Sequence, residues 1–431
     1  MMKFQRSMIF YFLFLCSARN IAYSQVEASY KNIPVSLTGY LSHVIKGNLG
    51  YIAAQLNVSI AEAELKASRV LPDPEVTIMY SNNEDRRLQM GQSLETGLTY
   101  PINLGNKRKA GIGLARSEYE LSGLMLDTYL QNLRAEAALY YFTGLKNRSI
   151  YQLQVDIYKQ LTQLARADSI RLLKGEATGL DALQSSLEAR SQLTEVDQSL
   201  ADMQNAFVNM MYVRGKKLSD TLDIPTDSFP YRKRYYDMNM LMDHAVENRA
   251  ELLAAIKNKE VSENYLNLIK ANRAIEMSLE AGYSYNSVVK NEIAPAPDFN
   301  GLSAGIAVPL KFSGLNKGPV QSANLAIRKS EMIYEETELQ IRSEVVQAFN
   351  DFVAQDKKVE HYNSGLIEDA YKILQGRIYS YQHGESGLID VLNAQRTYIE
   401  LQLSYINALF EYTSSLIKLE RSADIWDLTA N

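Results

Sequence analysis

Residues 175–183 read GEATGLDAL and residues 384–392 read GESGLIDVL, so the same glycine, glutamate, aspartate and leucine spacing occurs twice. Each stretch lies inside a long tract without proline. Glycine in such a place suits a tight reversal between two helices, because the reversal can require a positive φ. We therefore interpret residues 175–178 and 384–387 as the turns of two long helical hairpins.

The tracts around these turns are typical of very long helices. Residues 102–224 and 320–431 lack proline, which costs about 3 kcal/mol inside a helix. Apolar residues recur there at intervals that alternate between four and three. They are Leu126, Leu130, Leu133, Ala137, Tyr140 and Gly144 in the first tract, and Ile341, Val345, Ala348, Phe352, Val359, Tyr362 and Leu366 in the second. This heptad seam predicts helices packed side by side with a shallow left-handed crossing.

The chain is predicted to be two copies of one unit. An offset of 208 residues superposes the two seams and carries Gly97-x-x-x-Pro101 onto Gly305-x-x-x-Pro309. The two turns differ by 209 residues, and His43 matches His244 at an offset of 201. The repeated unit is a helix, two strands and a long helical hairpin. We place the copies at residues 25–224 and 225–431, the second ending in a C-terminal equatorial tail.

Two segments of alternating polarity precede each long helix and predict four strands per chain. The outward apolar positions are Val76, Ile78 and Tyr80; Leu94, Thr96, Leu98 and Tyr100; Met277, Leu279, Ala281, Tyr283 and Tyr285; and Leu302, Ala304, Ile306 and Val308. Each run has the length of about 9–11 residues that a tilted membrane strand needs. Two ordinary hairpins that cap a coiled coil would show the same pattern.

The N-terminus is expected to be a targeting segment. Lys3 and Arg6 precede an apolar run at residues 8–15, and residues 22–24 (AYS) suit signal peptidase, so residues 1–24 are interpreted as a signal peptide. Cys16, the only cysteine, raises the alternative of a lipidated N-terminus, although the bulky Leu15 before it disfavours that cleavage.

Composition and motifs exclude several classes of function. The net charge of −5 argues against a nucleic-acid partner. No phosphate-binding loop, HExxH motif or nucleophile elbow is present, which argues against an enzyme. The four histidines have no ligand spacing, so neither a resident metal nor another cofactor is expected.

The duplication and the tract YQHGESGLIDVLNAQR at residues 381–396 resemble the TolC family of outer-membrane efflux proteins. The resemblance covers essentially the whole mature chain. It implies a mainly helical fold with four membrane strands, in which a homotrimer closes a twelve-stranded β-barrel continuous with a helical periplasmic tunnel. An equatorial collar would come from residues 220–237 and the C-terminal tail. The implied function is the outer-membrane duct of a tripartite efflux system, with outer-membrane lipid, a periplasmic adaptor and an inner-membrane pump as partners.

The resemblance also assigns roles to single residues. Asp390 matches the aspartate whose three copies narrow the tunnel entrance, and Asn393 stands where a second aspartate is found, so one acidic ring is expected instead of two. Tyr381 and Asp181 match a latch between coiled coils, although Ser386 replaces the arginine that usually contributes. Arg377 or Arg396 could serve instead. An N-cap or first-turn acid is the alternative interpretation of both aspartates.

The two turns would form the tip to which an adaptor docks. Their leading residues are Gly175, Glu176, Gly384 and Glu385. The tract PINLGNKRK at residues 101–109 resembles the CzcC- or CusC-like heavy-metal branch, although basic residues there also suit interfacial anchoring. Drugs or metal cations are both possible substrates. Type I protein secretion and a periplasmic coiled-coil scaffold or adaptor remain alternatives.

Overall fold

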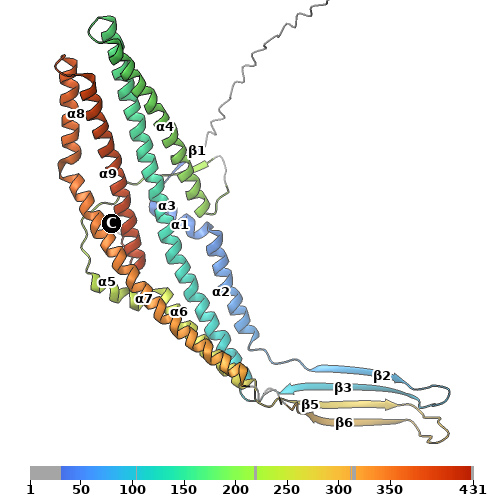
Figure 1. Cartoon of the computed structure of the whole chain (residues 1–431). Helices are drawn as coiled ribbons and strands as arrows, with labels where there is room; N and C mark the ends of the chain where they lie inside the picture. The colour runs from blue at the N-terminus through green and yellow to red at the C-terminus, as the bar shows by residue number, and fades with distance from the viewer. Residues whose placement is uncertain (1–30, 103, 218–220, 311, 313–316, 429–431) are drawn as a thin grey trace, which may run out of the picture.

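The computed structural model describes residues 31–102, 104–217, 221–310, 312 and 317–428. The molecule is elongated, with four strands at one end and the tips of two helical hairpins at the other (Figure 1). The expected signal peptide, including Cys16, lies outside the described residues. No helix in the described part combines the length and the apolar character needed to cross a membrane.

The elements follow the same order in both halves of the chain. The first half contains α1 (Leu37–Gly47), α2 (Leu49–Ala67), β2 (Glu75–Asn82), β3 (Gln92–Ile102), α3 (Lys107–Leu173) and α4 (Gly179–Val213). The second contains α5 (Met238–Asn248), α6 (Ala250–Ala271), β5 (Met277–Asn286), β6 (Phe299–Ala307), α7 (Gly318–His361), a π turn (Tyr362–Leu366), α8 (Ile367–Gln382) and α9 (Leu388–Ser422). The long helices and the four strands are confirmed, whereas the repeat boundary at residue 225 stays a prediction.

The first helix predicted for each repeat is in fact two helices. The break between α1 and α2 is at Asn48 (φ −65°, ψ 117°), and the break between α5 and α6 is at Arg249 (φ −64°, ψ 119°). The Asn48 side chain accepts a hydrogen bond from the Tyr51 N–H at 2.8 Å, which caps α2. The two breaks are 201 residues apart, the offset that relates His43 to His244.

The four strands form one antiparallel sheet in the order β2-β3-β5-β6. The register pairs Ile78 with Thr96, Thr96 with Tyr283 and Tyr283 with Leu302, so the predicted apolar positions share one face. The other face carries mostly small and acidic residues, with Met79 and Phe299 as exceptions, and both outer strands have an open edge. A second, unpredicted sheet pairs β1 (Lys31–Val35) in parallel with β4 (Thr221–Pro225).

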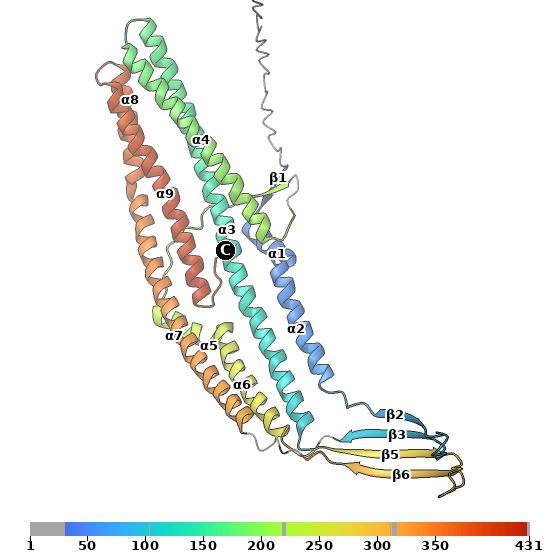
Figure 2. The ribbon, with the colours of Figure 1, turned by 45° about the vertical axis from the view of Figure 1, so that its right-hand side comes forward.

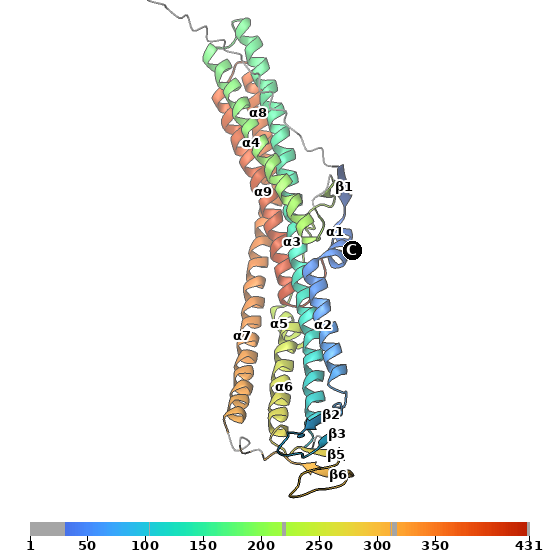
Figure 3. The ribbon, with the colours of Figure 1, turned by 90° about the vertical axis from the view of Figure 1, so that its right-hand side faces the viewer.

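The helices next to the sheet form a single row. Helix α2 packs on α3, α3 on α6 and α6 on α7, and the turned views show the row continuing directly from the strands (Figures 2 and 3). Beyond the middle of the molecule, α3 pairs with α4, and α8 pairs with α9. Each chain therefore contributes a row of helices with one free side at α2 and another at α7.

The main core lies at the equator, where helices from both repeats meet. The seam residues Leu133, Ala137, Ile341, Val345 and Phe352 are all buried there. The Tyr40 hydroxyl donates to the carbonyl of Met210 at 2.8 Å, and the Tyr141 hydroxyl donates to the carbonyl of Val35 at 2.9 Å. A side chain at Gly144 would place its Cβ 2.7 Å from the Met210 sulfur, so the close approach of α3 and α4 requires glycine.

The seam of the second repeat is interrupted by the π turn. Gly365 has φ 109° inside it, and Leu366 is 43% exposed, so the prediction that Leu366 continues the seam is wrong. A π turn holds one more residue than an α-helical turn. The offset between repeats grows from 208 at Phe352 to 209 at Gly384, so this turn accommodates the additional residue.

Candidate functional site

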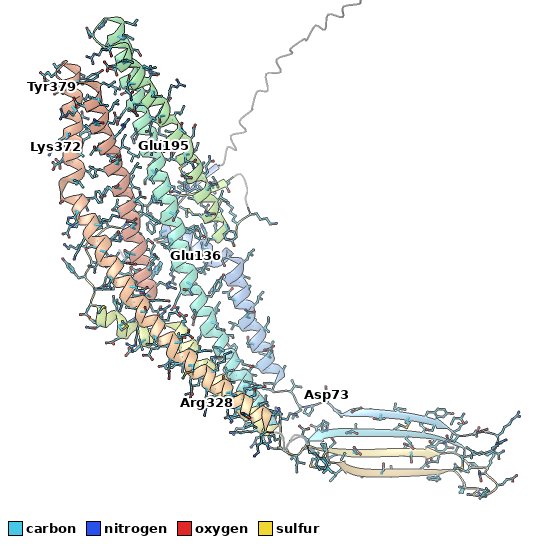
Figure 4. All side chains as sticks on the ribbon, viewed as in Figure 1. Asp73, Glu136, Glu195, Arg328, Lys372 and Tyr379 are labelled. Carbon is cyan, nitrogen blue, oxygen red and sulfur yellow. The ribbon has the colours of Figure 1, made fainter. Side chains whose placement is uncertain are left out.

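Both hairpin turns have the same backbone structure. Gly175 has φ +77° and Gly384 has φ +75°. After each glycine, the glutamate N–H bonds the carbonyl five residues earlier: Glu176 to Arg171 at 2.8 Å, and Glu385 to Ser380 at 2.9 Å. This is the helix-ending pattern in which a left-handed glycine lets the chain reverse. Both predicted turns lie at the end of the molecule farthest from the strands (Figure 1), and the α8 residue Tyr379 lies close to the second of them (Figure 4).

The two matched aspartates, Asp181 and Asp390, make different side-chain contacts. Asp181 belongs to a capping box, because its N–H donates to the Thr178 hydroxyl oxygen at 3.1 Å and its carboxylate accepts from the Thr178 backbone N–H at 3.3 Å. In the second repeat, Gly387 occupies the N-cap position and has no side chain to offer. The Asp390 carboxylate consequently has no hydrogen-bond or ion-pair partner among the described residues. The capping interpretation holds for Asp181. Asp390 lies in the first turn of α9, where the helix dipole favours an acid, so the first-turn interpretation also fits it.

Asn393 follows Asp390 by one helical turn on α9. It is exposed, whereas Asp390 is half-buried. Residues three apart on a helix lie on the same face, so the two predicted entrance residues share one side of α9 just after the tip. Leu388, Val391 and Leu392 are buried around them and fix that orientation.

Tyr381 is joined to Asp168, not to Asp181. Its hydroxyl donates to Oδ1 of Asp168 at 2.7 Å, with both side chains buried, and the Arg171 guanidinium lies 4.4 Å from the centre of its ring. Burial and the Asp168 carboxylate raise the pKa of Tyr381 well above its ordinary value, so the hydroxyl remains a donor. The contact ties α8 of the second hairpin to α3 of the first.

Asp168 and Arg171 were missed in the sequence, although a signal exists. Asp168 follows the buried Leu161 by seven residues, so it is an acid at a seam position of α3. A polar residue at such a position commonly fixes a specific pairing. Its second oxygen, Oδ2, is buried and has no hydrogen-bond partner among the described residues, which makes Tyr381 the donor on which this carboxylate depends.

A second link joins the hairpins nearer the middle of the molecule. Arg396 of α9 contacts the carboxylate of Glu188 in α4, and Gln184 also donates to that carboxylate at 3.1 Å. Arg377, the other arginine considered for the latch, is exposed and its side chain has no partner in the described part of the chain. The Ser386 hydroxyl is buried and makes no hydrogen bond to the residues that the structure describes. Of the two arginines considered, only Arg396 is therefore placed between hairpins.

The described part of the collar, residues 221–237 with the tail after α9, packs around the equator. Its centre is Glu420, which is fully buried and accepts from the N–H groups of Asp427 and Leu428 at 3.1 and 3.0 Å. Arg234 lies 3.1 Å from both Glu420 and Asp427. This cluster fastens the tail and the segment before α5 to α9.

The stability that depends on Glu420 is expected to fall as the pH rises through about 7. Burial raises the pKa of Glu420 from 4.5 to about 7. Between these values the folded chain binds a proton that the unfolded chain has lost, so the contribution is complete below the unfolded pKa and disappears above the folded one. At about 1.4 kcal/mol per pKa unit, it amounts to at most about 3 kcal/mol.

Urea unfolding at several pH values between about 5 and 8 would measure this slope. In Glu420→Gln the contribution should be missing, so the variant should lose less stability than the unsubstituted chain over that interval. Equal slopes in the two proteins would show that Glu420 does not take up the proton.

No group of three or more histidine, cysteine, aspartate or glutamate side chains in the described residues is arranged to hold a metal ion. The predicted entrance residues, Asp390 and Asn393, lie on one face of α9 just after the turn. The arrangement offers a carboxylate at the tip, two links between hairpins and an exposed pair of turns.

Comparison with known proteins identifies the chain's relatives. The family model described as outer membrane efflux protein matches residues 45–211 and 241–423. The chain is 20% identical over 391 residues to the cobalt-zinc-cadmium resistance protein CzcC of Cupriavidus metallidurans, covering 90% of each protein. It is 22% identical over 408 residues to the outer membrane protein TolC of Vibrio cholerae, covering 88% of this chain and 89% of that one.

Solved structures share the fold. A structure of CusC has a TM-score of 0.73 at 16% identity and covers 90% of this chain and 91% of that one. The CmeC outer membrane channel of Campylobacter jejuni has a TM-score of 0.75 at 13% identity, covering 90% and 85%. These similarities extend over the strands, the row of helices and both hairpins together.

Proposed function

This chain belongs to the outer membrane efflux protein family, and from that premise we propose that it is the passive exit duct of a tripartite efflux system. It is a channel of the outer membrane with a periplasmic helical extension, and it is not an enzyme. Because it is an outer-membrane channel, the alternative of a periplasmic scaffold is excluded. Its partners are proposed to be a periplasmic adaptor and an inner-membrane pump.

The main support for this proposal is that the sheet and the helix row of each chain end in two open sides. The sheet ends at β2 and β6 with unpaired edges, and four strands cannot close on themselves. Open edges are excluded in lipid because nothing satisfies their backbone groups. Three copies joined edge to edge would give twelve strands. We propose this homotrimeric barrel, continued by three rows of helices that form a tunnel.

The free sides of the helix row support the same assembly. Apolar residues on α2 recur at intervals of three and four and are exposed in the single chain: Leu49, Ile52, Leu56 and Ile60. On α7 an exposed set recurs every seven residues: Leu325, Met332 and Leu339. Such stripes are typical of helices that pack against another helix, so α7 of one copy is proposed to contact α2 of the next.

Leu56→Asp is expected to dissociate the trimer. In the single chain this position is 58% exposed, so the change should leave the fold of each copy intact. In the assembly the carboxylate would be buried against α7, at a cost of at least about 2 kcal/mol per interface. Analytical ultracentrifugation of detergent-solubilised protein measures the mass. Gln55→Asp, on an exposed position of another side of α2, is the control and should stay trimeric; a trimeric Leu56→Asp variant would rule out this interface.

We also propose roles in this trimer for the predicted tip residues. Three Asp390 carboxylates without capping partners are proposed to form the acidic ring at the tunnel entrance, with Asn393 one turn further on. The latch is proposed to be Tyr381 with Asp168, supported by Arg396 with Glu188, while Asp181 caps its helix. The glycine turns at residues 175–178 and 384–387 are proposed as the adaptor-docking surface.

Divalent metal cations are proposed as the first cargo to test, because one relative is named for cobalt, zinc and cadmium resistance. Hydrophobic drugs are the second, and protein secretion is the third. Growth of a strain that lacks the protein, on metal salts, detergents and drugs, separates them. Sensitivity restricted to metals supports the first, sensitivity to drugs and detergents supports the second, and unchanged growth on every compound contradicts an efflux role for this chain.

A further inference from the structure

A groove lies between the beginning of α3 and the end of α6. Its volume is about 520 Å³, and the polar side chains that line it are those of Asn106, just before α3, of Lys109 from α3 and of Asn264, Asn267 and Lys270 from α6. The small residues Gly105, Ala110 and Gly113 leave the space between these side chains open. No acidic residue lines the groove.

The groove lies at the level where the strands give way to helices. The paired strands β3 and β5 end together at Ile102 and Met277. Lys109 follows Ile102 by seven residues, and Lys270 precedes Met277 by seven, so both lysines are within about two helical turns of the sheet.

The two lysines of the groove differ from the other basic residues around them. Lys107 is neutralised by Glu276 at 2.8 Å, and Arg108 donates to the carbonyl of Arg69 at 2.5 Å. Neither Lys109 nor Lys270 has an ion-pair partner in the described part of the chain. Two uncompensated ammonium groups with amide donors between them match the charge and the acceptors of a phosphate group.

We infer that this groove binds the phosphate of a membrane phospholipid headgroup. Apolar positions of the strands, among them the paired Tyr100 and Leu279, follow within nine residues of the lysines along the chain, so a phosphate held in the groove would leave acyl chains free to lie along the sheet. A basic pocket between helices at the headgroup level is a known way for proteins to hold a specific lipid. The site would fix the height of the channel in the membrane.

Native mass spectrometry of the detergent-solubilised full chain tests the assignment, with dioctanoyl phosphatidylglycerol as the added probe. The double variant Lys109→Gln/Lys270→Gln is expected to bind it about tenfold to thirtyfold more weakly than the unsubstituted protein. Lys217→Gln/Lys418→Gln, two exposed lysines away from the groove, makes the same change in charge and should bind normally. Dioctanoylglycerol, which has the same chains without phosphate, should not bind to the groove in any of them.

Three results would overturn the inference. The first is equal retention of the phospholipid by the groove variant and the control variant. The second is binding of dioctanoylglycerol as strong as that of the phospholipid, because the phosphate would then be irrelevant. The third is competition by inorganic phosphate without any retained lipid, which would assign the groove to free phosphate. Analytical ultracentrifugation of the same samples confirms that the variants still assemble as the unsubstituted protein does.

Discussion

Replacing Asp390 with alanine is expected to abolish block of the channel by divalent cations and to weaken its preference for monovalent cations. In the proposed trimer the three carboxylates converge on one constriction, and rings of this kind select cations. The Gly387 cap leaves each Asp390 carboxylate without an internal partner, so its charge acts on the passing ion. Removing three charges from one ring should raise the concentration of divalent cation needed for half block by at least about tenfold.

Single-channel recording in planar bilayers, with and without added Mg²⁺, makes the measurement. Glu400→Ala removes an exposed carboxylate further along α9 and is the matched control. Asn393→Asp should have the opposite effect to Asp390→Ala, since it would add a second acidic ring one turn along the same face. Conductance of Asp390→Ala equal to that of the unsubstituted channel, both with and without Mg²⁺, would remove Asp390 from the entrance.

Tyr381→Phe is expected to loosen the tip and increase conductance. The change deletes one hydroxyl and leaves the buried Asp168 carboxylate without its donor, at a cost of about 1–3 kcal/mol. That contact joins α8 to α3, so its loss destabilises the closed state, in which the two hairpins lie together. About 1.4 kcal/mol corresponds to a tenfold shift between two states, so the open population should rise by about tenfold or more.

Tyr379→Phe provides the control, because this neighbouring tyrosine on α8 is exposed and its hydroxyl has no partner among the described residues. Asp168→Asn tests the other side of the contact, and a double-mutant cycle with Tyr381→Phe should show coupling between the two positions. Equal conductance of the Tyr381→Phe and Tyr379→Phe channels would mean that the Tyr381–Asp168 bond does not hold the tip closed.

Much of this architecture could be predicted because its determinants are local. Proline exclusion and heptad spacing act along the chain, and the turn predicted at residues 175–178 lies directly after the end of α3 at Leu173. Polarity alternation located all four strands, since a strand with one apolar face repeats every two residues. The helix breaks at Asn48 and Arg249 also had a visible signal in the offset of 201, but neither residue is a glycine or a proline.

The partner of Tyr381 could not be predicted in the same way. Asp168 and Asp181 flank the same turn on α3 and α4, and both are acids. Which of them meets Tyr381 depends on how the first hairpin is rotated against the second. Asp181 is occupied by Thr178, whereas Asp168 faces the other hairpin from a buried seam position. Only packing between hairpins distinguishes them, and that is a tertiary property.

The π turn at residues 362–366 makes the two hairpins mechanically unequal. Helix α3 runs unbroken from Lys107 to Leu173, whereas the matching stretch of the second repeat has a joint at Gly365. One added residue rotates everything beyond it by about 100° around the helix axis. In a ring of three chains, stiff and jointed hairpins would alternate. Such a ring could widen by bending every second hairpin outward while the others keep their shape, so the pseudo-sixfold tip would open with only threefold symmetry.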